Sequence, residues 1–212
     1  MAESLIDYDN FIYAEMMVHP VLFTHHNAKK IAIINQTSRN CLLDEALKHN
    51  TLKEVCLVSL QPYAAIDKRV TYSAGELSTW PSHFAANTLD SIIISGDFLN
   101  ATPLILKQYL NALTSGGILI HQSASLFELQ TLKATCRTLQ DTGFHDLQIM
   151  HFPQPSFPSG LRCAVMAMKD TSFKRVREKD IFNKTFTTRY YNFDTHKAAL
   201  VMPEFMREEI VI

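Results

Sequence analysis

The sequence is poor in glycine, with 6 glycines in 212 residues, and it contains no glycine-rich phosphate-binding motif. A GxGxxG fingerprint and a P-loop both need clustered glycines, because the backbone must approach the phosphates closely. The GxSxG turn that carries the nucleophile of α/β-hydrolases is missing as well. These absences argue against a standard dinucleotide-binding oxidoreductase, a P-loop NTPase and a serine hydrolase.

The sequence also lacks an excess of either charge. Lys and Arg number 20 and Asp and Glu number 21, for a net charge of -1. This balance gives no electrostatic reason to expect a nucleic acid or an anionic membrane as a partner. The apolar runs are short, as at residues 31–34 and 92–94, and residues 1–10 carry acids where a signal peptide needs a basic start. We therefore expect a cytoplasmic protein with no membrane or nucleic-acid partner.

Cysteine and histidine show no pattern of pairing or metal ligation. The four cysteines have no paired spacing, and three lie in or beside apolar runs, as is typical of buried thiols in a reducing compartment. The nine histidines are dispersed, and the adjacent His25 and His26 are expected to point apart. The sequence therefore predicts buried thiols and no metal site.

What the sequence does contain is an alternation of two hydrophobic periodicities. Short apolar runs typical of buried parallel strands alternate with segments of helical spacing. Strands are predicted at residues 30–34, 55–60, 69–74, 91–95 and 118–121, and helices at residues 42–49, 102–113 and 126–139. Two later strand-like runs, at 145–152 and 162–168, are joined by a proline-rich turn at 153–160 and predict an antiparallel hairpin.

This order of elements predicts a single α/β domain over residues 1–212. We expect a mainly parallel sheet with helices on both faces and the hairpin as its antiparallel edge. Residues 1–28 are expected to lead into the sheet as a helix. Residues 169–212 are expected to form an exposed connection, at 169–188, and a tail that ends in a short amphipathic helix at 203–210.

Three segments of the sequence resemble motifs of the spermidine synthase (polyamine aminopropyltransferase) family. YDNFIYAEM at residues 8–16, followed by HP at 19–20, resembles DEFxYxEM…HP, and PSFPSG at 155–160 resembles PTYPSG. RYYN at 189–192, with HKAA at 196–199 and PEF at 203–205, resembles RYYNxxxHxAAFxLPxF. The segments occur in the family's order, so the chain is identified as a divergent member.

The resemblance implies a methyltransferase-like (Rossmann-type) sheet and a specific reaction. In the family, the primary amine of putrescine attacks the propyl carbon of decarboxylated S-adenosylmethionine and releases methylthioadenosine. No cofactor is implied beyond this co-substrate, and the implied ligand is a polyamine or a nucleoside.

The resemblance also bears on assembly. The tail motif lies near the subunit contact in the family, which implies a homodimer; a monomer whose tail folds onto its own sheet is the alternative. Only seven residues precede Tyr8, so the family's N-terminal β domain is expected to be absent.

On the donor side, the residues that the resemblance points to are replaced. The turn after the first strand is GGGDGG in the family and NQTSRN at residues 35–40 here, so Asn35 begins a turn without glycine and Ser38 stands where the family has its acid. Ser59 replaces the Glu that bridges the ribose hydroxyls. Glu76, after the third strand, is the best-preserved donor-side acid, and a solvated loop carboxylate is its other interpretation.

The catalytic and acceptor positions are altered in part. SGDF at residues 95–98 replaces the family's DSSDP, which leaves Asp97 as the candidate general base or as an ordinary turn residue before a helix. On the acceptor side Tyr13 is kept, Phe157 replaces a tyrosine, and Gln122 falls where the family carries a Gln.

Two functions compete on this basis. An active aminopropyltransferase would use Asp97 and Glu76 with a rebuilt donor loop. A protein with eroded motifs would have weak or absent activity and would act by binding a polyamine or nucleoside, or as the dimer partner of an active relative. A generic methyltransferase is a third alternative, which would need the same lost glycine loop. The balance of replacements favours the second.

Overall fold

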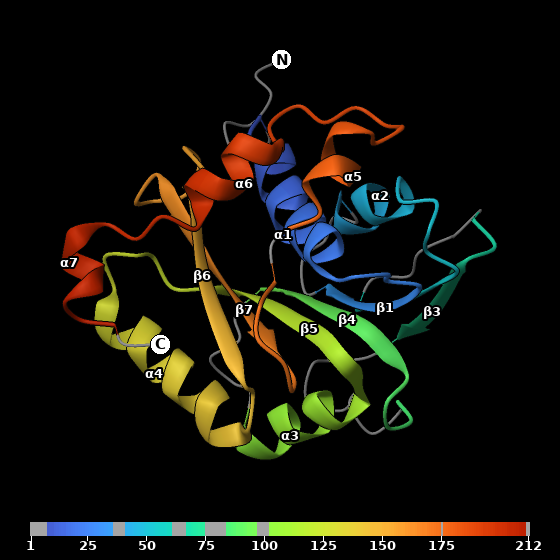
Figure 1. Cartoon of the computed structure of the whole chain (residues 1–212), viewed down its shortest axis with the longest axis horizontal. Helices are drawn as coiled ribbons and strands as arrows, with labels where there is room; N and C mark the ends of the chain where they lie inside the picture. Colours follow the sequence, from blue (N-terminus) through green and yellow to red (C-terminus); the bar gives the residue numbers. More distant parts are fainter. Residues whose placement is uncertain are drawn as a thin grey trace.

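The computed structural model describes residues 8–35, 41–60, 67–74, 84–96, 102–174 and 176–210. A seven-stranded sheet of order β3-β2-β1-β4-β5-β7-β6 forms its centre (Figure 1). The strands are β1 (Lys30–Asn35), β2 (Glu54–Ser59), β3 (Val70–Ala74), β4 (Leu89–Ser95), β5 (Leu113–Ser123), β6 (Asp146–Pro153) and β7 (Leu161–Met168). The first five are parallel, whereas β7 runs antiparallel to both β5 and β6.

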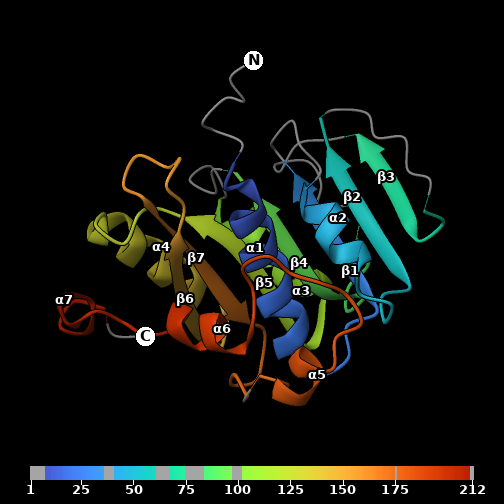
Figure 2. The same ribbon diagram turned by 90° about the horizontal axis from the view of Figure 1, so that it is seen from above.

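Helices cover both faces of this sheet. The helices are α1 (Asn10–Thr24), α2 (Cys41–Leu47), α3 (Pro103–Ala112), α4 (Leu129–Thr142), α5 (Glu178–Phe182), α6 (Phe193–Ala199) and α7 (Glu204–Arg207). Helices α1, α2, α5 and α6 lie on one side of the sheet and α3 and α4 on the other, while β3 and β6 are its opposite edges (Figures 1 and 2).

Successive side chains of a strand point to opposite faces of the sheet, which explains the two layers of helices. In β1, Ile31 and Ile33 pack in a cluster with α1 and α2, whereas Ala32 and Ile34 pack in a second cluster with α3 and α4. Each of these four side chains is at most 1% exposed. A strand buried on both faces reads as a continuous apolar run, which is the pattern that the sequence shows. The predicted α/β fold, with a parallel sheet, helices on both faces and an antiparallel hairpin, is confirmed.

Two element boundaries differ from the sequence prediction. The helix predicted to run to residue 113 ends at Ala112, because Leu113 already pairs with Leu89 and begins β5 five residues before the predicted start. The helix predicted from residue 126 begins at Leu129 and runs on to Thr142. Gly143, with φ of 110°, ends that helix in the left-handed conformation that glycine favours.

The segment from 169 to 212 contains more helix than predicted. The expectation of an exposed, irregular connection at 169–188 was wrong for α5, whose Ile181 is 1% exposed and packs in the core with α1. Helix α6 was not predicted, although Asn192 and Thr195 form a capping box at its start. The tail helix α7 is confined to four residues. Short helices such as these are stabilised by packing more than by their own periodicity, so a periodicity search misses them.

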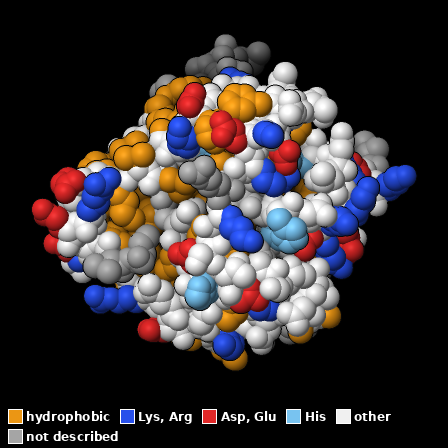
Figure 3. Space-filling model, in the orientation of Figure 1, with side chains coloured by type: hydrophobic (Ala, Val, Ile, Leu, Met, Phe, Trp, Pro, Cys, Tyr) orange, Lys and Arg blue, Asp and Glu red, His pale blue; other side chains and the backbone are white. Residues whose placement is uncertain are grey.

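The face seen in Figure 1 carries basic and acidic side chains interspersed, as the near-zero net charge leads one to expect (Figure 3). Among the helices of the described residues, none combines the length and apolar character needed to cross a membrane.

Candidate functional site at the carboxyl edge of the sheet

Three neighbouring parallel strands end together at the carboxyl edge of the sheet. Asn35 at the end of β1 is in register with Ser59 of β2 on one side and with Ser95 of β4 on the other. Strand order reverses at β1, since β2 and β3 lie to one side and β4 and β5 to the other. Open α/β sheets bind their ligands at the carboxyl ends of the strands beside such a switch point.

The side chains at this switch point are neutral, and two of them are bonded to each other. Asn35, Ser59 and Ser95 are at most 2% exposed. The Ser95 hydroxyl donates to Asn35 Oδ1 at 2.8 Å. An amide and a hydroxyl can orient a ligand through hydrogen bonds, but neither is a general base at neutral pH and neither balances a positive charge.

The structure brings together two of the four donor-side residues predicted from sequence, Asn35 and Ser59. Ser38, Glu76 and the candidate base Asp97 lie outside the described residues, so their roles stay predictions.

On the acceptor side, Tyr13 of α1 and Phe157 of the β6–β7 turn meet across a third residue, Arg162. The Arg162 guanidinium carbon lies 4.1 Å from the centre of the Phe157 ring and 5.2 Å from that of Tyr13. The Tyr13 hydroxyl is buried and makes no hydrogen bond of ordinary geometry with the described residues. Burial raises the pKa of the Tyr13 phenol above its usual range, and the Arg162 charge opposes that shift in part. The two predicted acceptor aromatics therefore share one wall.

This wall is held in place by two polar contacts. Asp9 is 1% exposed, and its carboxylate accepts from the Ser156 backbone N–H at 2.7 Å and from the Ser156 hydroxyl at 2.6 Å. Arg162 Nε donates to Oε1 of Gln154, a side chain only 3% exposed, at 2.7 Å. The sequence prediction missed Asp9, Gln154 and Arg162. A signal for Arg162 was present, because it is the single charged side chain within the apolar segment 161–168.

Gln122, the third predicted acceptor residue, lies near the carboxyl end of β5, opposite Ala164 of β7 and half-buried. Its strand is separated from β1 by β4, so Gln122 is not adjacent to Asn35 in the sheet. The neighbouring His121 is fully buried, and burial lowers its pKa to about 4. His121 is therefore neutral at physiological pH.

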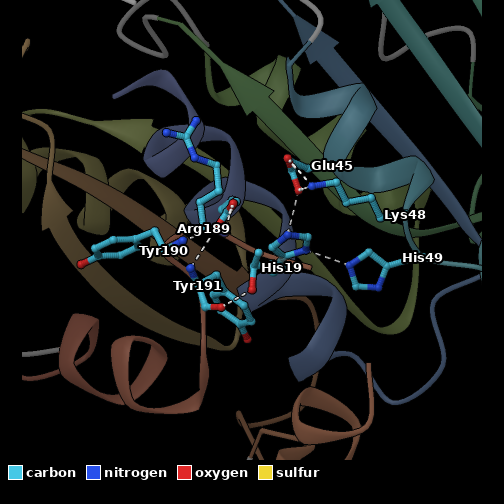
Figure 4. Close-up of polar contacts among 9 residues, drawn as sticks. His19, Glu45, Lys48, His49, Arg189, Tyr190 and Tyr191 are labelled. Carbon is cyan, nitrogen blue, oxygen red and sulfur yellow. Dashed lines mark hydrogen bonds and ion pairs between the residues drawn. The ribbon is translucent and has the colours of Figure 1, made fainter. Parts of the chain in front are cut away.

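The tail motif RYYN is anchored to α1 by a buried carboxylate. Glu15, 1% exposed, accepts the backbone N–H groups of Arg189, Tyr190 and Tyr191 at 2.8, 2.9 and 2.7 Å. The Tyr191 hydroxyl lies 2.9 Å from His196 Nδ1. Figure 4 shows the tail residues converging on α1. We call Glu15, residues 189–191 and His196 the tail anchor.

A second polar chain joins α1 to α2 beside the tail anchor. His19 Nε2 lies 3.0 Å from Glu45 Oε2, and His19 Nδ1 lies 2.9 Å from His49 Nε2 (Figure 4). Because a carboxylate accepts only, His19 Nε2 carries the proton, and His49 Nε2 then donates to His19 Nδ1. Lys48 pairs with Glu45 at 2.7 Å. Two motif residues, Glu15 and His19, thus serve the packing of α1.

Within the described ranges, no group of three or more His, Cys, Asp or Glu side chains is placed to hold a metal ion.

The strand order, with a seventh strand inserted antiparallel between β5 and β6, defines a methyltransferase-like fold with its site at the carboxyl edge. A family model described as the spermine/spermidine synthase domain matches residues 10–70. The chain is 34% identical over 238 aligned positions to a polyamine aminopropyltransferase of Thioalkalivibrio sulfidiphilus, covering 97% of this chain and 80% of the relative. The corresponding enzyme of Nitrosococcus oceani is 34% identical, with 94% and 77% covered. The chain belongs to the polyamine aminopropyltransferase (spermidine synthase) family.

Solved structures confirm the fold. A spermidine synthase in complex with the transition-state analogue AdoDATO superimposes with a TM-score of 0.83 at 21% identity, covering 94% of this chain and 75% of that one. A spermidine synthase from Thermotoga maritima gives a TM-score of 0.83 at 22% identity, with 94% and 74% covered.

Proposed function

We propose that this chain is a polyamine-metabolism protein whose aminopropyl transfer is weak or absent, and that it acts by binding at the carboxyl edge. The observation that carries the proposal is the hydrogen bond between the Ser95 hydroxyl and Asn35 Oδ1, buried where β1 and β4 end. At this position the two strands offer neutral groups that bond to each other.

The chemistry of the transfer explains why this matters. A C–N bond forms between the amine and the propyl carbon as the C–S bond breaks, and the attacking nitrogen must give up a proton. The donor carries a sulfonium and the acceptor carries ammonium groups, so carboxylates are needed both as a base and as counter-charges. Asn35, Ser59 and Ser95 offer neither a base nor a negative charge.

Among the described residues, Asp9 and His121 are two titratable groups of this region, and neither offers a free base. Both Asp9 oxygens accept hydrogen bonds from Ser156. Burial keeps His121 neutral, with a pKa of about 4, so it is a weak base. A rate supported by hydrogen bonding and proximity alone would fall well below that of an enzyme with a placed general base, which contributes roughly 10²–10⁴-fold.

A direct test measures methylthioadenosine release from decarboxylated S-adenosylmethionine and putrescine, with the Nitrosococcus oceani enzyme as positive control. We expect turnover at least about 100-fold below the control. Turnover within tenfold of the control would refute the proposal. Thermal shift tests whether methylthioadenosine binds, because a compound that binds the folded state raises the melting temperature.

A second candidate role is that of a dimer partner, either with itself or with an active relative. Phe127 and Phe205 stack with ring centres 6.1 Å apart and are 62% and 40% exposed. Exposed stacked aromatics are typical of protein contacts. Light scattering of the purified chain, alone and mixed with an active relative, tests this role. A monomer in both samples would rule it out.

A further inference from the structure

We infer that Arg162 is a specificity-determining residue that excludes diammonium ligands from the aromatic wall formed by Tyr13 and Phe157. The inference deepens the proposed function and rests on it. An ammonium group binds over an aromatic face within about 6 Å of the ring centre. Arg162 already occupies that position for both rings, at 5.2 and 4.1 Å.

The guanidinium is fixed in this position from three sides. The rings belong to α1 and to the β6–β7 turn. Arg162 is the second residue of β7, directly after that turn. Its Nε donates to the buried Gln154 Oε1 at 2.7 Å, which sets the plane of the guanidinium. The β6–β7 turn, which carries Phe157, is held at the start of α1 by the hydrogen bonds between Ser156 and Asp9. The cation is therefore part of the wall.

An arriving diamine meets two costs at this wall. It cannot use the ring faces unless Arg162 moves away and gives up its own ring and amide contacts. If Arg162 stays, the two positive charges repel each other at a distance where solvent screening is incomplete. Each of these effects is worth roughly tenfold in affinity. The wall consequently selects against putrescine and similar dications.

The test compares putrescine binding to the wild type and to Arg162→Met by isothermal titration calorimetry. Methionine keeps an apolar stem over the rings and removes the charge. We expect no measurable heat for the wild type at millimolar putrescine, and an affinity at least about tenfold higher for Arg162→Met. Equal affinity of the two proteins would overturn the inference.

Two control variants separate the position of the charge from its mere presence. Arg162→Lys keeps a cation at the wall and should behave as the wild type does. Arg189→Met removes an arginine that lies over another ring of α1, with its guanidinium carbon 3.6 Å from the centre of Phe11. It should leave putrescine binding unchanged. If Arg162→Lys or Arg189→Met binds putrescine as well as Arg162→Met does, the inference fails.

The outcome is readable even if one variant does not fold. Circular dichroism and melting of each protein without ligand identify such a case, and Arg162→Gln then replaces Arg162→Met. The binding result is also separable from the proposed function. Putrescine binding by Arg162→Met without methylthioadenosine release supports both statements. No gain in binding refutes the inference and leaves the proposal of weak transfer to its own turnover assay.

Discussion

Two regions of the molecule illustrate how the family's motifs have diverged in this chain. In the tail anchor, Glu15 accepts three backbone N–H groups, and its motif residues match the family's pattern. At the carboxyl edge, Asn35, Ser59 and Ser95 replace residues that the resemblance assigns to the ligand and the reaction. The residues that anchor the tail to α1 are retained, whereas these three positions at the carboxyl edge differ from the family's motifs. Retention of a fold thus says little about retention of its chemistry.

The largest expected effect is acid destabilisation of the region around the tail anchor. Burial lowers the pKa of His49 to about 3 and that of His196 to about 4, with His19, Arg177 and Lys48 adding to the shift of His49. In the unfolded chain these histidines bind protons near pH 6.5. The free energy of unfolding therefore decreases as the pH falls below 6.5, and it goes on decreasing until the pH reaches the pKa values of the folded state. The slope is about 1.4 kcal/mol per pH unit for each histidine.

Urea unfolding between pH 7 and 4.5 measures this loss. In His196→Gln the free energy of unfolding should depend less steeply on pH, because the unfolded chain takes up one proton fewer. A free energy of unfolding that stays constant across this range would contradict the buried, neutral state of the two histidines.

Glu15→Gln tests the tail anchor itself. The amide keeps one acceptor oxygen but loses the charge that strengthens three hydrogen bonds, so we expect a loss of about 2–4 kcal/mol in the free energy of unfolding. Glu208→Gln, at an exposed position of the tail, is the matched control and should change stability by less than about 0.5 kcal/mol. Similar losses for both variants would mean that the three hydrogen bonds of Glu15 contribute no more to stability than an exposed carboxylate does.

Ser95→Ala tests the hydrogen bond at the carboxyl edge, with Ser91→Ala of the same strand as its control. Ser95 donates to Asn35, whereas the Ser91 hydroxyl is buried and has no hydrogen-bond partner among the described residues. We expect Ser95→Ala to cost about 1 kcal/mol and Ser91→Ala to be neutral or stabilising. The reverse order in urea unfolding would show that Ser95 is not bonded as described.

The most local expected effect concerns α6. Asn192→Ala removes the capping box that Asn192 forms with Thr195, at a cost of about 1 kcal/mol. Hydrogen exchange should increase in residues 193–199 while β1 keeps its protection. Unchanged exchange in α6 would show that its packing on α5 and β6, and not the cap, determines where it begins.

The sheet was predictable because its strands are short apolar runs, such as residues 30–35, that are buried on both faces. The grouping of Asn35 with Ser59 was predictable for the same reason, since parallel neighbours end at one edge. The wall of Tyr13, Phe157 and Arg162 could be predicted only in part. Its aromatics follow from the resemblance, but the place of Arg162 depends on how the β6–β7 turn seats against α1. That contact joins residues 147 apart in the chain, which no local pattern reveals.

The hydrogen bonds between Asp9 and Ser156 have a consequence for the order in which the chain folds. Ser156 is synthesised 147 residues after Asp9, so a ribosome-bound chain that has already built the first four strands still has no aromatic wall. Loop closure over such a span is slow compared with the pairing of neighbouring elements. The wall therefore forms only after the β6–β7 turn has been synthesised and has docked on α1. A ligand specific to it would recognise the finished protein and ignore its partly folded precursors.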